Sequence, residues 1–119
     1  MAQYLPLFRP GDVVTFDVTA AVTGGQPVQV GTVDRSVEPA EAASATYVGV
    51  AGHDAAVGDK VTVEVGKPVH ELVASGAVAL GDKVEAAGSG KIRTATTGTV
   101  IGLALSAAAD GAAVQVLQF

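Results

Sequence analysis

One segment of the sequence occurs twice. Residues 46–63, TYVGVAGHDAAVGDKVTV, align without a gap on residues 99–116, TVIGLALSAAADGAAVQV, after a shift of 53 positions. Each copy has an apolar stretch, a turn of small residues ending in glycine, and a second stretch with the alternation of a β-strand. We therefore expect two related β-units packed on one core. Eight of the 18 positions are identical: Thr46/Thr99, Gly49/Gly102, Ala51/Ala104, Ala55/Ala108, Ala56/Ala109, Gly58/Gly111, Val61/Val114 and Val63/Val116.

The repeat makes two local predictions. Gly58 and Gly111 end the turns, and we expect both at positive φ, where glycine is the default residue. The alternating apolar residues are expected to be buried together. The predicted shared core contains Val50, Val61, Val63, Leu103, Val114 and Val116.

Short apolar stretches with turn residues between them continue outside the repeat. They recur about every 8–12 residues, which is typical of a sandwich or barrel. We predict an all-β fold, a small β-barrel or sandwich of about 8–10 short strands with an internal two-fold repeat and little helix. Residues 34–45 are the exception and predict a loop, with one helical turn after Pro39. The expected strands outside the repeat cover residues 13–18, 27–33, 69–74 and 91–95.

The chain length favours a single domain. With 119 residues, it is long enough to bury a core but not to form several large domains. Residues 1–10 contain two prolines and no period, so they predict an N-terminal arm. Residues 11–119 are expected to form one β domain.

Composition excludes several classes of function. The formal charge is −5, and the seven basic residues are scattered, so we expect no nucleic-acid partner. There is no cysteine to form disulfides. No apolar run approaches 18 residues, and the N-terminus lacks the pattern of a secretion signal, so neither a membrane partner nor export is predicted.

Residues 88–91, GSGK, resemble part of a phosphate-binding loop. That loop requires glycine at position 85 and Ser or Thr at position 92, where this chain has Glu85 and Ile92. Strands flank the segment, whereas the loop precedes a helix. We therefore predict a hairpin turn at residues 88–90.

No constellation for catalysis or metal binding is evident. His53 and His70 are the only histidines and lie in different segments, whereas a metal site needs three or four convergent ligands. No serine lies in a G-x-S-x-G motif, and no carboxylates are paired for acid–base chemistry. The sequence predicts no enzyme, no cofactor and no metal.

A small β-barrel carrier or ligand-binding module is the alternative. The Gly-Asp-Lys-Val of residues 58–61 recurs at residues 81–84, and it resembles the half-barrels of biotinyl and lipoyl carrier domains. Such domains carry a modified lysine at a hairpin tip. Lys67 and Lys91 are the candidates here, but neither has the flanking residues of a carrier lysine.

The order and spacing of five motifs resemble the small capsid cement, or head decoration, proteins of tailed bacteriophages. The motifs are G-D-x-V-x-F at residues 11–16, V-T-x-G-x-P-V-x-V-G at 22–31, and G-V-A followed by A-A-x-G-x-x-V-x-V at 49–63. They continue with A-x-x-x-G-D-x-V at residues 77–84 and I-G-x-A-L-x-A-A-A-D-G-x-x-V-x-V-L at 101–117. Together they cover nearly the whole chain.

The resemblance implies a virion protein, made in the host cytoplasm, that binds the outer surface of an assembled head and stabilises contacts between capsomers. Its implied partner is the major capsid protein, and its implied state is a homo-oligomer, with a trimer favoured. Aromatic residues and arginine are enriched at interfaces. We therefore predict an interface with the capsid or a neighbouring subunit at the two ends of the chain: Tyr4, Leu5, Leu7, Phe8, Arg9 and Phe119.

Overall fold

The computed structural model describes residues 7–8 and 11–119, and every described element is a strand. In this part of the chain no helix is long and apolar enough to cross a membrane. The all-β prediction is confirmed. The strands are β1 (Val13–Val18), β2 (Pro27–Val30), β3 (Ser36–Pro39), β4 (Tyr47–Ala51), β5 (Lys60–Glu64), β6 (Val69–Ala74), β7 (Lys83–Gly88), β8 (Lys91–Thr94), β9 (Gly102–Ala104) and β10 (Ala113–Gln118).

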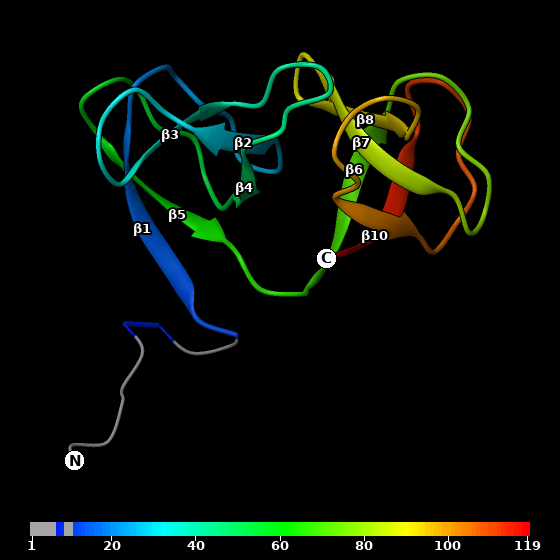
Figure 1. Ribbon diagram of the computed structural model, residues 1–119, viewed down its shortest axis with the longest axis horizontal. Helices are drawn as coiled ribbons and strands as arrows, with labels where there is room; N and C mark the ends of the chain where they lie inside the picture. Colours follow the sequence, from blue (N-terminus) through cyan, green and yellow to red (C-terminus); the bar gives the residue numbers. More distant parts are fainter. Residues whose placement is uncertain (1–6, 9–10) are drawn as a thin grey trace.

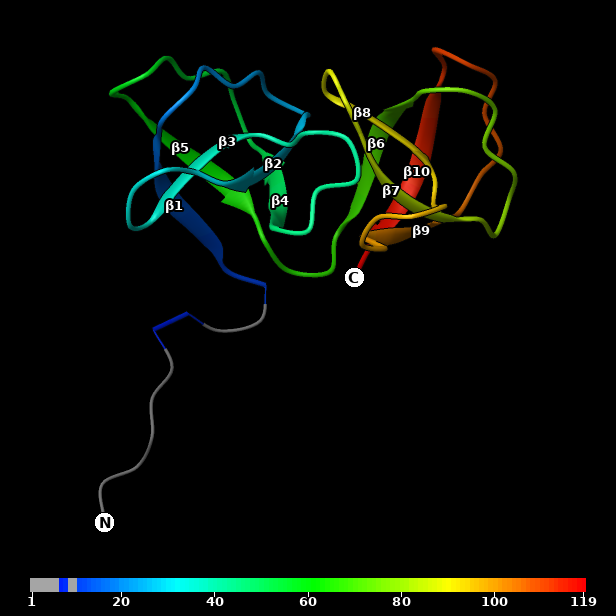
Figure 2. The same ribbon diagram turned by 45° about the horizontal axis from the view of Figure 1, so that its top comes forward.

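The ten strands form two closed barrels that lie side by side (Figures 1 and 2). The N-terminal barrel has the order β1-β3-β2-β4-β5, and the C-terminal barrel has the order β10-β6-β8-β7-β9. Within each barrel, the first and third strands along the chain pair in parallel. The C-terminus lies close to the junction between the barrels, beside the segment that connects β5 to β6 (Figure 1).

The internal repeat extends over both barrels. Ala51 pairs with Val63 in the N-terminal barrel, and Ala104 pairs with Val116 in the other, which is the predicted shift of 53. The first strands of the two barrels are also equivalent, but at a different shift: Asp17 pairs with Ser36, and Val73 pairs with Lys91. Equivalent residues therefore lie 56 apart in β1 and β6, and 55 apart in β3 and β8.

The prediction of one shared core is wrong, because each barrel has its own. Val61 and Val63 are buried in the N-terminal core, and Val114 and Val116 in the C-terminal core. A five-stranded barrel closes around its inward side chains, so two barrels enclose two separate interiors. Val50 is buried, but it joins the core of the C-terminal barrel. Leu103 is only partly buried.

Two other local predictions have different outcomes. Residues 34–45 contain β3 and no helical turn, so that prediction is wrong. Pro39 is tolerated because it ends β3, where the pairing with β1 has already stopped at Val37. The predicted hairpin turn is confirmed, since Gly88, Ser89 and Gly90 all have positive φ and join β7 to β8.

The predicted glycine conformations are confirmed. Gly58 has a φ of 91° and Gly111 a φ of 81°. Each donates its backbone N–H to the last residue of the first strand of its barrel, Gly58 to Val18 and Gly111 to Ala74. The two turns are therefore equivalent in conformation and in contact.

Candidate functional surfaces

The junction between the barrels is organised by Gln118 at the end of β10. Its side-chain oxygen accepts a 2.6 Å hydrogen bond from the Tyr47 hydroxyl of β4. Its side-chain nitrogen donates to the backbone oxygens of Glu64 and Gly66, at 3.2 and 2.7 Å. Because the nitrogen faces two acceptors, the orientation of the amide is fixed. Gln118 is 2 % exposed, so this polar side chain is buried with its hydrogen bonds made.

His70 and Tyr47 meet the same amide oxygen. The Nε2 atom of His70 lies 3.2 Å from Gln118 Oε1 and is therefore the donor. Burial lowers the pKa of His70, against the hydrogen bond to Gln118 and the charge of Glu64, which raise it. Burial also raises the pKa of Tyr47, so its hydroxyl stays protonated as a donor.

Strand β4 contributes to both barrels. Ala51 lies in the N-terminal core, whereas Val50 lies in the C-terminal core, with Tyr47 packed against the same cluster. Ala43 adds a backbone hydrogen bond of 2.8 Å to Ala86 across the junction. A Cβ on Gly98 would lie 2.6 Å from the Cα of Ala43, so the two backbones are in close contact. This packing fixes the two barrels relative to each other.

Each barrel holds the segment after its third strand with a buried polar side chain. In the C-terminal barrel, Glu85 is fully buried and accepts N–H bonds from Thr96, Thr97 and Gly98, together with a 2.9 Å ion pair from Arg93. The N–H of Thr96 and the guanidinium of Arg93 lower the pKa of Glu85 to about 2. This carboxylate therefore stays ionised although it is buried.

Gln29 occupies the equivalent position in the N-terminal barrel. Gln29 pairs with Glu38 in the β2–β3 hairpin, as Glu85 pairs with Arg93 in β7–β8. Its side chain accepts the N–H of Glu41 and donates to Glu38. In both barrels this residue therefore accepts a backbone N–H from the segment after the third strand. The residue is the charged Glu85 in one barrel and the neutral Gln29 in the other.

The predicted interface residues fall in two places. Leu7 is 91 % exposed and Phe119 is 53 % exposed. Phe8 is partly held by its own barrel, because the guanidinium of Arg35 lies 4.9 Å from its ring and 5.5 Å from the ring of Phe16. Tyr4, Leu5 and Arg9 lie outside the described residues.

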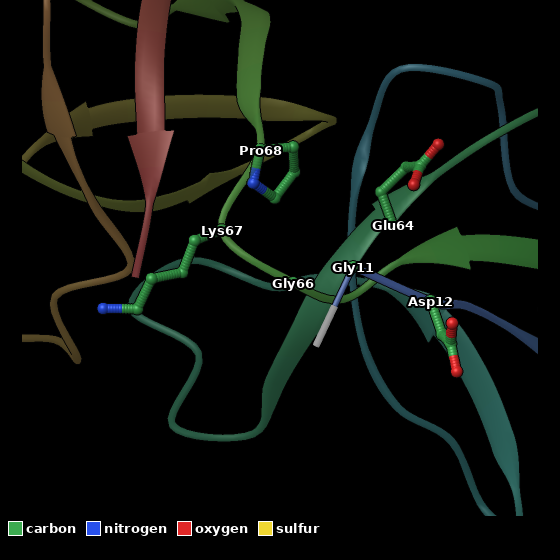
Figure 3. Close-up of a pocket in the computed structure, with 6 residues that line it drawn as sticks. All are labelled: Gly11, Asp12, Glu64, Gly66, Lys67 and Pro68. Atoms are coloured by element: carbon green, nitrogen blue, oxygen red, sulfur yellow. The ribbon is translucent and has the colours of Figure 1, made fainter. Parts of the chain in front are cut away.

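A shallow hollow of about 240 Å³ lies at the end of the N-terminal barrel (Figure 3). The amine of Lys67 points away from the carboxylates of Glu64 and Asp12, so the charged groups around the hollow do not converge (Figure 3). Pockets for small ligands have volumes of about 300–1,000 Å³ and a few convergent polar groups. The hollow is lined by Gly11, Asp12, Glu64, Gly66, Lys67 and Pro68.

The other candidates from the sequence lie apart from one another. His53 is in an exposed turn of the N-terminal barrel, bonded to the backbone of Asp54 and Thr62, whereas His70 is at the junction. Among the described residues no group of three or more His, Cys, Asp or Glu side chains is placed to hold a metal ion. Lys67 is exposed in the connection between the barrels, and Lys91 begins β8.

The junction residues were not predicted from the sequence. Tyr47 and Gln118 lie in expected strands, but nothing in the pattern shows that their side chains meet. Glu85 carried a signal that was not used: it is a charged residue between Val84 and Ala86, in a strand whose other residues after Lys83 are apolar or glycine. Such a residue predicts a buried group with partners.

Two barrels built from one repeat, joined by a buried network and bearing exposed apolar side chains, define a structural protein that acts through its surfaces. The sequence pattern of the phage cement protein family matches residues 8–118. The chain belongs to this family and is a capsid cement protein, a component of the outside of the phage head.

The fold also occurs in a solved phage structure. The N base of head fiber gp8.5 of bacteriophage phi29 superimposes with a TM-score of 0.71 at 20 % identity, over 91 % of this chain and 93 % of that one. At this identity the likeness shows the fold alone. No curated protein matches the sequence.

Proposed function

We propose that the protein binds the major capsid protein on the outer surface of the assembled head and stabilises contacts between neighbouring capsomers. The match of the phage cement family over residues 8–118 is the observation that supports this. In this role the protein has no catalytic activity and no cofactor. Residues 11–119 act as one rigid domain, since the Gln118 network ties the barrels together.

We further propose that the capsid or a neighbouring subunit contacts the two ends of the chain. Leu7 and Phe119 support this, because they are exposed apolar side chains. Tyr4, Leu5, Phe8 and Arg9 complete the proposed surface. Many identical copies bind one shell, so a contact of under about 800 Å² per subunit is sufficient through avidity. The protein acts as a homo-oligomer, with a trimer favoured.

The carrier or ligand-binding alternative has little support. Its lysine would need a hairpin tip: Lys67 lies between the barrels rather than at such a tip, and Lys91, which follows the β7–β8 turn, lacks the flanking residues of a carrier lysine. The hollow beside Lys67 is small and lacks convergent polar groups. Intact-mass measurement of the purified protein would detect an acyl or biotinyl adduct, and such an adduct would favour the carrier.

The test of the proposed function is binding to purified heads. Full-length protein and a variant lacking residues 1–9 are incubated with expanded and unexpanded heads and sedimented. We expect the full-length protein to pellet with expanded heads, and the truncated protein to keep its melting temperature but lose binding. If the full-length protein does not bind heads, the proposed function is wrong. If the truncated protein binds normally, the arm is not the interface.

A further inference from the structure

Each barrel carries an outward row of four residues that face one another across four strands. The two rows are equivalent in the repeat, since every member of the second lies 53 or 56 positions after its counterpart. The row of the N-terminal barrel is Pro27, Val50, Glu64 and Val13, on β2, β4, β5 and β1. The row of the C-terminal barrel is Lys83, Leu103, Leu117 and Val69, on β7, β9, β10 and β6.

In the first row, Val50 is covered by the other barrel of the same chain, whereas Val13 at the far end of the row is 46 % exposed. Pro27 is fully buried, and Val50 is 3 % exposed although it points out of its own barrel. Val50 lies in the core of the C-terminal barrel. The N-terminal barrel therefore docks on its neighbour through Val50 of this row.

In the described part of the chain, the second row is more exposed than the first at Leu103 and Lys83, the positions that correspond to the buried Val50 and Pro27. Val69 is 55 % exposed, Lys83 is exposed, and Leu103 and Leu117 are only partly buried. Leu103 is therefore the counterpart of Val50, and its larger side chain is more exposed than that of Val50.

The surroundings of the second row are also more apolar than the fold requires. In the N-terminal barrel the outer face carries the ion pair of Lys60 with Asp17. The equivalent residues of the C-terminal barrel are Ala113 and Val73, and Val73 is 40 % exposed. Leu117 stands where the N-terminal barrel has Glu64. The same fold tolerates charges at these positions, so folding alone does not require the apolar side chains of Val73 and Leu117, although the exposed Glu71 lies on the same face between Val69 and Val73.

A matching receiving surface exists at the end of the N-terminal barrel. In the C-terminal barrel, Ile101 and Gln118 lie at the end against which Val50 and Tyr47 pack. Ile101 and Gln118 are both buried. Their counterparts in the N-terminal barrel, Val48 and Val65, pack against the core of their own barrel but are only partly buried. The hollow beside Glu64 and Gly66 lies at this end.

We propose that the row Lys83–Leu103–Leu117–Val69 docks on the open end of the N-terminal barrel of a second copy, at Val48 and Val65. The contact between copies then repeats the contact between the two barrels within one copy. The inference rests on the homo-oligomer part of the proposed function and assigns its interface. It does not depend on which surface binds the head.

Such a contact is heterologous, because two different surfaces meet. Each copy has one donor surface, the row on the C-terminal barrel, and one receiving surface, the end of the N-terminal barrel. A heterologous contact generates a closed ring or an open filament. A trimeric ring would place six related barrels in sequence, alternating contacts within and between chains.

The first experiment breaks the donor surface with a residue that the repeat itself uses. Leu117→Glu introduces the residue found at the equivalent position, Glu64, so we expect the variant to fold with an unchanged circular dichroism spectrum. Burying an unpaired carboxylate in the contact should weaken self-association about 100-fold or more, measured by sedimentation. Leu80→Glu is the matched control, because Leu80 is 70 % exposed in a turn outside both surfaces. It should associate as wild type does.

The second experiment tests that the contact is heterologous. Val65→Glu breaks the receiving surface and leaves the donor surface intact, and its circular dichroism spectrum must match that of wild type because Val65 also packs against the core of its own barrel. Each variant alone should be monomeric, whereas an equimolar mixture should form a dimer of one Leu117→Glu chain and one Val65→Glu chain, and nothing larger. The remaining donor surface belongs to one variant and the remaining receiving surface to the other.

Several results would overturn the proposal. They are a monomeric wild type at about 100 μM, unchanged association of a folded Leu117→Glu variant, or no dimer in the mixture. A monomeric wild type that associates only after removal of residues 1–10 would also overturn it, because the arm would then cover the receiving end.

Loss of head binding by Leu117→Glu with self-association intact would assign the row to the shell instead. Failure of the wild type to bind heads, with association as expected, would refute the capsid proposal alone.

Discussion

The Tyr47 hydroxyl in the N-terminal barrel donates a 2.6 Å hydrogen bond to the side-chain oxygen of Gln118 in the C-terminal barrel. The two residues are 71 positions apart, and Gln118 is the penultimate residue of the chain. This bond, with the two that Gln118 donates to β5 and the connecting segment, joins three parts of the chain at one buried point. Barrel orientation therefore depends on a few polar atoms as well as on apolar packing.

We predict that Tyr47→Phe destabilises the protein by about 1–2 kcal/mol, because it removes one buried hydrogen bond and leaves its acceptor with fewer partners. The free energy of unfolding, measured with urea, checks the value. A double-mutant cycle with Gln118→Met isolates the pair, and we expect a coupling energy of at least about 0.5 kcal/mol. Additive effects of the two substitutions would contradict the importance of this bond.

The buried carboxylate of Glu85 predicts a loss of stability in acid. Its folded pKa of about 2 lies below its ordinary value, so the unfolded chain binds more protons between those two values. Stability from this group is fully present above about pH 4.5 and is lost as the pH falls toward 2. Thermal unfolding from pH 6 to pH 2.5 should show this decrease.

Glu85→Gln tests the assignment of that acid transition. The variant should be less stable at pH 6, because an amide cannot serve both Arg93 and the three N–H donors as a carboxylate does. The melting temperature should also depend less on pH between 4.5 and 2.5 than in wild type. Equal pH dependence in wild type and variant would show that other carboxylates cause the transition.

His70 predicts a smaller effect at higher pH. Burial lowers its folded pKa, so its contribution is present above the ordinary value of about 6.5 and is lost as the pH falls below it. Stability should therefore decrease between pH 7.5 and pH 5.5. His70→Gln should remove this part of the decrease, and a difference in slope between the two proteins in this range is the measurement.

The repeat could be recognised from the sequence only where the spacing between equivalent residues is constant. Residues 46–63 and 99–116 keep one shift because their turns have equal length, so β4, β5, β9 and β10 could be matched. The first halves of the barrels could not, since the β2–β3 connection is longer than the β7–β8 turn and the shift changes from 56 to 55. A comparison at a fixed shift loses the relationship there.

The Gly-Asp-Lys-Val match at residues 58–61 and 81–84 reports a shared turn rather than an equivalent place. Gly58 precedes β5, whereas Gly81 precedes β7, and both have positive φ. The counterpart of Gly81 in the first barrel is Gly25, which has a φ of 85°. Local sequence therefore identified the turn conformation but not its position in the repeat.

The candidate surfaces were less predictable than the strands. Leu7 and Phe119 were predicted as interface residues because of their apolar types and their positions near the chain ends, whereas the junction follows only from the three-dimensional structure. The apolar character of Val50 predicts burial, but the strand register points its side chain out of its own barrel. Its contact with the second barrel explains how it is buried there. Periodicity gives the face of a strand on which a residue lies, but not what covers that face.

The turn glycines provide the last prediction. Gly58 and Gly111 have φ values of 91° and 81°, which a residue with a Cβ rarely adopts. No atom lies within 4 Å of a Cβ built on either residue, so the cost of alanine there is conformational and not steric. We expect Gly58→Ala and Gly111→Ala each to destabilise by about 1–2 kcal/mol in urea unfolding. Gly66→Ala is the control, because it lacks a positive φ and its Cβ would meet only ordinary contacts at 3.5 Å or more. Equal losses at all three positions would contradict the role of the left-handed backbone, because the chain-entropy effect of alanine at Gly66 should be neutral or stabilising.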